Sequence, residues 1–183
     1  MKKVEIYTDG ACKGNPGPGG YGCVLLYRQH RLELSGGFRQ TTNNRMEILA
    51  VIKALEVLKE PCEIDLYSDS RYVVDAVNQN WLKNWQRNGW RKSDKSDVLN
   101  RDLWERLSRL MPKHQIHFHW IKGHASNPCN DHCDQLASAA ALAPLEKLQQ
   151  DSVFEAGDGG FFEITCNQQK NTNFCDLHIK SDQ

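Results

Sequence analysis

The sequence lacks any hydrophobic run close to the ~18 residues that a membrane-spanning helix needs. A strand pattern already begins by Lys3, which leaves no room before it for the ~7–15-residue apolar segment of a signal peptide. The two absences together predict a cytoplasmic protein with no membrane partner. The seven cysteines are odd in number and irregularly spaced, so a disulfide framework is not expected.

The chain also lacks net charge, with 23 basic and 23 acidic residues. A neutral total argues mildly against a nucleic-acid partner, but the charge is unevenly distributed. Residues 1–144 carry 20 Lys and Arg against 16 Asp and Glu, a net charge of +4, whereas residues 145–183 carry 3 against 7, a net charge of −4. At 183 residues one domain is the prior, so we expect a mildly basic body, 1–144, with an acidic extension, 145–183.

The first strand pattern ends on Asp9 and is followed by an unusually glycine-rich stretch. Residues 4–8 alternate with the period of a strand, and six glycines and two prolines occupy positions 10–22. Taken alone, Asp9 fits an Asp-Gly turn at the start of a hairpin. Further strands are predicted at 21–27 and 31–35, which would make the first three strands an antiparallel meander.

A helix pattern with one apolar face follows at 45–60, and Glu47 lies near its start. The next strand, 63–68, also ends on a carboxylate, Asp69. A strand, a crossing helix and a second strand favour parallel pairing, which would bring Asp9 and Asp69 to the same edge of the sheet. Two acids in one place repel each other unless a cation lies between them.

The second half of the chain predicts a helix at 98–111, a strand at 114–121 and a helix from about 130 to 144. Asp131 and Asp134 both lie at the start of that last helix, and spacing alone does not separate them. A site with four carboxylates and no Cys-His cage favours Mg²⁺ or Mn²⁺ over Zn²⁺. Such a site suits phosphoryl displacement with two ions.

Residues 81–97 combine three tryptophans with basic residues. Aromatic and basic side chains that alternate in this way suit a surface that follows a nucleic-acid backbone. The alternative is a solvated helical hairpin in which Trp81 and Trp85, four residues apart, face inward.

Four blocks closely resemble type 1 ribonuclease H of the bacterial kind: YTDGACKGNPGPGGYG, TTNNRMEILAVIKALE, YSDSRYV and WIKGHASNPCNDHCDQLA. The resemblance runs from about Val4 to Pro144, and the Trp-rich segment resembles the basic protrusion of that family. It implies an α/β fold with a mixed five-stranded sheet, in which strands four and five run parallel to strand one and helices cover both faces. It also implies a monomeric endonuclease that hydrolyses the RNA strand of RNA–DNA hybrids and leaves 5′-phosphate and 3′-hydroxyl ends.

The resemblance further assigns residues to roles. It implies two bound ions, Mg²⁺ with Mn²⁺ as a substitute, and it selects Asp134 over Asp131. The implied metal ligands are Asp9, Glu47, Asp69 and Asp134, and His124 matches the family's mobile histidine. The implied contacts to the hybrid are Cys12, Asn15, Thr42, Asn43, Asn44, Trp81, Trp85, Arg91 and Lys92.

Two other functions remain as alternatives. A strand-transfer enzyme of the same superfamily would need further DNA-binding domains, for which the chain is short. A catalytically silent hybrid-binding module would be expected to lack at least one of the four acids. The extension 145–183 lies outside the resemblance. Alternating residues at 162–166 and 175–179 predict either a docked hairpin or a flexible tail.

Overall fold

The computed structural model describes residues 1–157 of the chain. Its strands and α-helices in chain order are β1 (Lys2–Cys12), β2 (Gly17–Tyr27), β3 (His30–Thr41), α1 (Asn43–Glu56), β4 (Cys62–Ser68), α2 (Arg71–Asn78), α3 (Trp81–Arg87), α4 (Arg101–Leu110), β5 (Gln115–Trp120), α5 (Pro128–Ala141) and α6 (Ser152–Ala156). Two 3₁₀ helices, η1 (Met111–Lys113) and η2 (Leu145–Lys147), follow α4 and α5.

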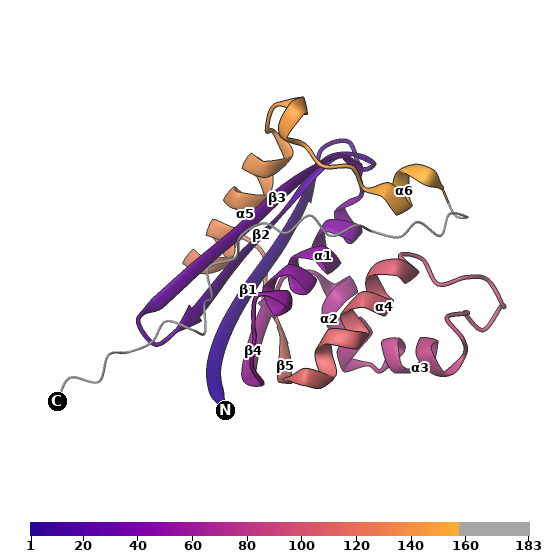
Figure 1. Cartoon of the computed structure of the whole chain (residues 1–183), viewed down its shortest axis with the longest axis horizontal. Coiled ribbons are helices and arrows are strands. Elements are labelled where there is room, and N and C mark those ends of the chain that lie inside the picture. Colours follow the sequence, from indigo (N-terminus) through magenta and orange to yellow (C-terminus); the bar gives the residue numbers. More distant parts are fainter. Residues whose placement is uncertain (158–183) are drawn as a thin grey trace.

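The five strands form one mixed sheet in the order β3-β2-β1-β4-β5 (Figure 1). The β1–β2 and β2–β3 pairs are antiparallel, and the β1–β4 and β4–β5 pairs are parallel. The predicted meander and the predicted parallel strands are therefore confirmed.

Helices α1 and α5 pack on opposite faces of this sheet. A Cβ atom at Gly10 would lie 2.6 Å from the backbone nitrogen of Glu47 in α1, and one at Gly22 would lie 2.3 Å from the carbonyl oxygen of Cys133 in α5. Neither position has room for a side chain. The prediction of helices on both faces is confirmed.

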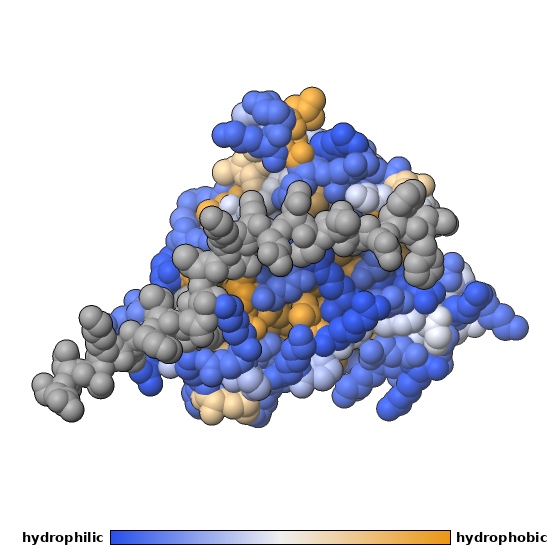
Figure 2. Space-filling view, viewed as in Figure 1, coloured by the Kyte–Doolittle hydropathy of each residue, from blue (hydrophilic) through white to orange (hydrophobic). Residues whose placement is uncertain are grey.

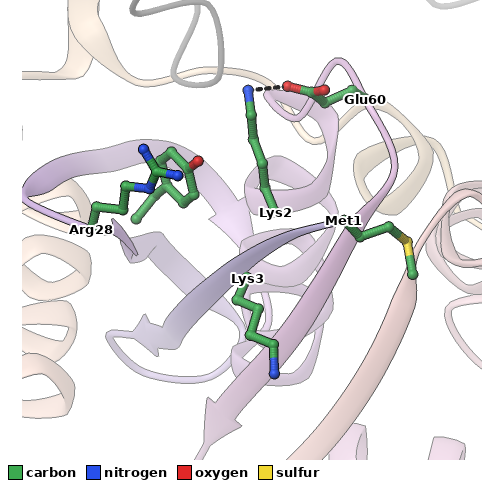
Figure 3. A pocket seen from close by; sticks show the side chains of 6 residues that line it. Met1, Lys2, Lys3, Arg28 and Glu60 are labelled. Atoms are coloured by element: carbon green, nitrogen blue, oxygen red, sulfur yellow. Dashed lines mark hydrogen bonds and ion pairs between the residues drawn. The ribbon is translucent and has the colours of Figure 1, made fainter. Parts of the chain in front are cut away.

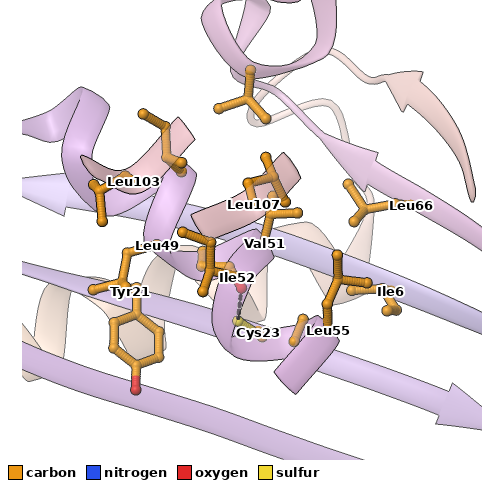
Figure 4. Packing of buried hydrophobic residues seen from close by; sticks show 14 of the residues in the cluster. Ile6, Tyr21, Cys23, Leu49, Val51, Ile52, Leu55, Leu66, Leu103 and Leu107 are labelled. Carbon is orange, nitrogen blue, oxygen red and sulfur yellow. Dashed lines mark hydrogen bonds between the residues drawn. The ribbon is translucent and has the colours of Figure 1, made fainter. Parts of the chain in front are cut away.

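The main core lies between the sheet and α4, with α1 in the middle (Figure 4). The sequence predicts that this helix buries a single apolar face. In the structure, every residue of α1 from 45 to 52 is buried, so the buried surface extends around the whole helix. A helix that is buried all round has neighbours on more than one side, here the sheet and α4. Each large side chain buried in this way contributes about 1.5–3 kcal/mol, so α1 is firmly held. The core residues labelled in the figure are Ile6, Tyr21, Cys23, Leu49, Val51, Ile52, Leu55, Leu66, Leu103 and Leu107.

The strands of the meander are longer than predicted. Strand β1 runs past Asp9 to Cys12, β2 begins at Gly17 instead of residue 21, and β3 continues to Thr41. Most of the glycine-rich stretch is therefore strand and not turn. Side chains are excluded at Gly20 and Gly22 by α5 and at Gly10 by α1, and a pattern of alternating side chains cannot reveal a strand built from such glycines.

Helix α4 begins three residues later than predicted. Asn100 has a left-handed backbone conformation (φ 60°) directly before Arg101, which breaks the helix that was expected from Val98. Leu99, which falls within the predicted helix 98–111, lies outside α4 and is 62% exposed.

Residues 145–157 follow α5 and cross the end of the sheet near the start of α1 (Figure 1). Gln149 extends the edge of β3: its N–H donates to the carbonyl of Gly37 at 2.9 Å, and its carbonyl accepts from Arg39 N–H at 2.9 Å. The hairpin considered for 162–166 and 175–179 lies outside the described residues.

Figure 2 shows a mostly hydrophilic surface with a hydrophobic area near the centre of the view. Within residues 1–157 no helix combines the length and the apolar character needed to cross a membrane.

Candidate active site

Asp9 and Asp69 meet because β1 and β4 are parallel neighbours in register. The last pair of this ladder is Thr8 with Ser68, and each carboxylate follows directly. Asp9 is held inside β1, which continues beyond it, whereas Asp69 is the first residue after β4. The predicted convergence of the two acids at one edge is observed.

Glu47 reaches the same edge from α1. The Thr42 hydroxyl caps this helix by accepting from Arg45 N–H at 3.2 Å, and Glu47 is the fifth helical residue. It therefore lies beyond the first turn, where the helix dipole would have stabilised its charge most. Capping does not explain why an acid occupies this position. The close approach of α1 to Gly10 carries Glu47 to Asp9.

Asp9, Glu47 and Asp69 form a compact acidic cluster. One carboxylate oxygen from each lies within 4.8 Å of the others. Asp9 and Glu47 are each only 5% exposed. Glu47 Oε2 is buried and has no hydrogen-bond partner among the described residues, while Asp9 Oδ1 accepts from Gly10 N–H at 2.8 Å.

Burial and mutual repulsion disfavour the negatively charged forms of the acids in this cluster. Burial, and then the negative charge of Asp69, raises the pKa of Asp9 to about 7. Burial, and then the charges of Asp9 and Asp69, raises the pKa of Glu47 well above its ordinary value. Buried carboxylates that repel one another and leave an oxygen unpartnered fit a hard divalent cation, which takes oxygen ligands. The residues present therefore fit Mg²⁺ or Mn²⁺.

Asp134 lies at the margin of this cluster. It is a half-buried residue of α5, and its charge contributes to raising the pKa of Asp9. It is not among the three acids whose oxygens lie within 4.8 Å of one another. Asp131 occupies the first turn of α5 and does not contribute to the raised pKa of Asp9 or Glu47.

His124 lies in the loop between β5 and α5. The loop begins against the cluster, because a Cβ atom at Gly123 would lie 2.6 Å from Asp69 Oδ2. His124 itself is exposed and has a left-handed backbone conformation (φ 57°). The loop therefore places His124 next in sequence to a residue that contacts Asp69, but His124 is not part of the cluster of Asp9, Glu47 and Asp69.

Trp120 and Arg71 also contact this edge and were not identified from the sequence. Trp120 Nε1–H donates to the backbone carbonyl of Asp69 at 3.0 Å, and the Arg71 guanidinium lies over the Trp120 ring, 3.6 Å from its centroid. In the sequence, Trp120 is simply one residue of the predicted strand 114–121. Its position at the end of that strand, level with the end of the strand that precedes Asp69, was the feature that could have placed it near the acids.

The predicted hybrid-contact residues near α1 come together from two segments. Asn15 Oδ1 accepts from Asn43 N–H at 3.1 Å, which joins the β1–β2 turn to the start of α1. Cys12 Sγ–H points to the carbonyls of Gly17 (3.5 Å) and Thr41 (3.4 Å). Asn15 and Asn44 are exposed, so this surface is open to a ligand.

The tryptophans of the predicted protrusion divide into two kinds. Trp81 is 37% exposed, but Trp85 packs against the fully buried Trp104, with ring centroids 5.6 Å apart. Trp85 is half-buried and packs against the core, as the alternative interpretation proposed, while its contact with the hybrid stays a prediction. Arg91 and Lys92 are exposed on a tight turn that is closed by Val98 N–H donating to Trp90 O at 3.0 Å.

A separate hollow of about 580 Å³ lies at the opposite end of β1 from Asp9 (Figure 3). The residues that line it are Met1, Lys2, Lys3, Tyr27, Arg28 and Glu60. It shares no residue with the acidic cluster.

The comparisons with known proteins agree on one family. The RNase H family model matches residues 1–142. Curated ribonucleases H from Desulforamulus reducens and Pseudoalteromonas atlantica are each 59% identical to this chain, over 79% and 81% of it and over 91% and 99% of their own lengths.

Solved structures agree as well. LC9-RNase H1, described as a type 1 RNase H with the type 2 active-site motif, is 29% identical and covers 77% of this chain and 72% of its own, with a TM-score of 0.70. LC11-RNase H1, solved in complex with an RNA/DNA hybrid, is 26% identical and covers 76% of this chain and 99% of its own, with a TM-score of 0.59. With its sheet order, its acidic cluster and these relatives, this chain belongs to the RNase H family.

Proposed function

We propose that this protein is an endonuclease that hydrolyses the RNA strand of RNA–DNA hybrids and leaves 5′-phosphate and 3′-hydroxyl ends. The observation that carries the proposal is the buried cluster of Asp9, Glu47 and Asp69, with its unpartnered Glu47 oxygen, in a chain of the RNase H family. The hybrid found with LC11-RNase H1 supports the substrate.

The four acids Asp9, Glu47, Asp69 and Asp134 would hold the metal, and Mg²⁺ is proposed, with Mn²⁺ as a substitute. A pair of such ions bound there with substrate would supply Lewis-acid stabilisation of the charge on the attacking water and on the leaving 3′ oxygen. The protein contributes the fixed positions of the carboxylates: Asp9 inside a paired strand, Glu47 on a buried helix, and Asp69 held by Trp120.

His124 is proposed as an accessory group. Its exposed position on the loop lets it approach a substrate phosphate, and an imidazole ring can accept or donate a proton in a general acid–base role. His124→Ala should therefore slow turnover without abolishing it.

The surface at Cys12, Asn15 and residues 42–44 is proposed to bind the hybrid through its sugars. Backbone amides and side-chain amides there can read the 2′-hydroxyls that distinguish RNA from DNA. Trp81, Trp85, Arg91 and Lys92 are proposed to contact the DNA strand, Trp85 with the accessible part of its half-buried ring. We also propose that the protein is a cytoplasmic monomer and that residues 1–144 form its catalytic domain.

The proposal is tested by cleavage of a labelled hybrid beside an RNA duplex and a DNA duplex, with Mg²⁺ and then with EDTA. Asp69→Asn should reduce cleavage by more than about 100-fold, beyond the effect of altering an outer-shell partner of a metal ligand. Asp65→Asn is the matched control, since Asp65 is on the same strand and pairs with His119 at 2.7 Å instead. Cleavage in EDTA, or near-normal cleavage by Asp69→Asn, would contradict the assignment. Binding of hybrid without cleavage would favour a silent module.

A further inference from the structure

Arg45, in the first turn of α1, is a buried cation shared by two distant segments. The residue is only 4% exposed. Nη1 and Nη2 donate to the two carboxylate oxygens of Asp102 at 2.8 and 2.6 Å. Nε and Nη2 donate to the two oxygens of Asp151 at 2.7 and 2.9 Å. The guanidinium thus joins α1, the start of α4 and the segment after α5.

Asp151 makes a second contact with the other side of the turn before α1. The Thr41 hydroxyl donates to Asp151 Oδ2 at 2.7 Å, and Asp151 is 8% exposed. Thr41 and Arg45 are the residues directly before and after residues 42–44. One carboxylate therefore holds both ends of the turn that the proposed function assigns to hybrid binding.

The segment that carries Asp151 is itself fixed on both sides. Gln149 pairs with the edge of β3 through two backbone hydrogen bonds of 2.9 Å. Glu155 accepts from Arg39 Nη2 at 2.7 Å in a partly exposed ion pair. Asp151 is consequently delivered to Arg45 by a docked segment and not by a loose tail.

The same guanidinium reaches the base of the Trp-rich protrusion. Arg45 Nη1 lies 3.4 Å from Asn100 Oδ1, and Asn100 Nδ2–H donates to the Tyr72 hydroxyl at 3.1 Å. The chain between α3 and α4 ends at Asn100. Arg45 therefore links the start of α1 to Asn100, which lies three residues beyond the Trp-rich protrusion, 81–97.

We propose that Asp151 is a positioning residue for hybrid binding, through which the segment 145–157 sets the geometry of residues 41–45. It does not touch the substrate; it fixes Thr41 and Arg45, and with them the amides of residues 42–44. This inference rests on the proposed function. A merely structural role would change the stability of the fold but not the affinity for hybrid in the folded state.

The test uses the full chain with Asp151→Asn, which keeps the shape of the side chain and removes its charge. Glu155→Gln is the matched control, because it removes one negative charge from the same segment at an exposed pair. Thermal unfolding first sets an assay temperature at which all variants are folded. Steady-state kinetics on labelled hybrid then give kcat and KM.

We expect Asp151→Asn to raise KM by at least about fivefold with kcat within about twofold, as for a residue that modulates binding without contact. Asp151→Glu should recover part of the loss, and Glu155→Gln should stay within about twofold of the wild type. An unchanged KM in Asp151→Asn, or a loss confined to kcat, would overturn the inference.

A second measurement separates this inference from the proposed function. Asn43 N–H donates to Asn15 Oδ1, so its exchange with solvent reports the geometry of the turn. Asp151→Asn should accelerate this exchange by at least about fivefold relative to Glu155→Gln. If wild-type protein does not cleave hybrid, the proposed function fails, and unchanged exchange at Asn43 would overturn the inference independently. Should Asp151→Asn not fold, Thr41→Val removes only the hydroxyl contact and is judged by the same two readouts.

Discussion

Arg45 and Glu47 lie two positions apart on α1 and are almost equally buried, yet their surroundings are opposite. Arg45 is neutralised by Asp102 and Asp151, with every carboxylate contact between 2.6 and 2.9 Å. Glu47 instead faces Asp9 and Asp69, which carry charge of its own sign, and its Oε2 has no partner among the described residues. One helix therefore combines a buried charge that the fold satisfies with one that it leaves for a cation.

The difference between the surroundings of Arg45 and Glu47 shows how one fold can be stable and still keep a cluster of buried acids. Burying charge is costly unless a partner and hydrogen bonds compensate for it. The fold supplies that compensation at Arg45, where the charge is structural. It withholds compensation at Glu47, where a metal ion would supply it.

The largest expected effect comes from removing, one at a time, the buried charges of Arg45 and Glu47. Arg45→Met leaves Asp102 and Asp151 without their buried cation and should cost about 3–5 kcal/mol. At about 2–4 °C per kcal/mol, the melting temperature should fall by roughly 10 °C or more. Glu47→Gln should raise the melting temperature by a few degrees in EDTA, because it relieves repulsion, while removing cleavage.

Calorimetry with Arg106→Met as control makes this comparison sharp. Arg106 pairs with Glu56 at 2.7 Å, but on a partly exposed surface. Such pairs contribute about 0–1 kcal/mol. If Arg45→Met and Arg106→Met melt together, the buried pair is not structural; if Glu47→Gln is destabilised, the repulsion has been overstated.

The next effect comes from removing the segment that satisfies Arg45. A chain ending after Pro144 lacks Gln149, Asp151 and Glu155, and should melt several degrees lower, at about 2–4 °C for each kcal/mol of stability removed. A chain ending after Gly157 keeps these three residues and lacks only 158–183, which include the apolar residues that the sequence predicts to dock a hairpin. Equal melting of the second chain and the full chain would assign the stabilisation to 145–157. An equal drop in both truncated chains would assign the stabilisation to residues 158–183 instead.

The acidic edge was predictable from the sequence because local rules place each acid. Asp9 and Asp69 follow strand patterns, Glu47 follows a capped helix start, and a parallel crossover makes the strand ends coincide. The exact bounds were not predictable. Strand β2 begins within the glycine run, at Gly17, and side-chain alternation cannot report a strand segment that has few side chains.

The Arg45–Asp151 contact was beyond sequence reasoning for a different reason. The two residues are 106 positions apart, and nothing in the local pattern at Asp151 points to a buried partner. Exposed charges are screened at cellular salt, so the charges of the extension do not by themselves predict that it docks. The structure docks the described part by charge nevertheless, which is effective because Arg45 and Asp151 are both buried.

A third expected effect is the pH dependence of stability in the absence of metal. The pKa of Asp9 rises from 3.8 to about 7 on folding. Between these values the folded protein holds a proton that the unfolded chain releases, so protonation favours folding and stability falls as the pH rises through this window. Asp9→Asn cannot titrate and lacks this fall.

The melting temperature of Asp9→Asn in EDTA should therefore exceed that of the wild type by little at pH 5 and by a few degrees at pH 8. Mg²⁺ should reduce the difference at pH 8, because a cation that binds only the folded wild type stabilises it. A difference that is constant from pH 5 to pH 8 would contradict the raised pKa.

A fourth comparison sets Trp81 against Trp85. Trp85→Ala removes a side chain that packs on Trp104 and should lower stability, towards the ~3–5 kcal/mol of large aromatic truncations in a core. Trp81→Ala should leave the melting temperature nearly unchanged and raise KM for hybrid, since stacking on a base is worth about 1–3 kcal/mol. A destabilised Trp81→Ala with normal KM would place both rings in the core.

The smallest expected effect concerns the exposed cations of the protrusion. Arg91→Gln with Lys92→Gln removes two exposed charges whose partners, the Lys95 carbonyl and Asp94, lie in the same exposed segment, so the rest of the fold should be unaffected. If both cations bind phosphates, the slope of log affinity against log salt should become shallower by up to about 0.9 for each phosphate that is no longer neutralised, taking the value for a B-form duplex. Lys3→Gln with Lys113→Gln is the control. It removes the same charge near the starts of β1 and β5, the end of the sheet that lies away from Asp9 and Asp69. Binding measured between about 50 and 200 mM salt should then show a changed slope in the first pair alone. Equal slopes in the two pairs would mean that Arg91 and Lys92 act only through the overall charge, and the protrusion would keep only its tryptophans, Trp81 and Trp85, as proposed contacts.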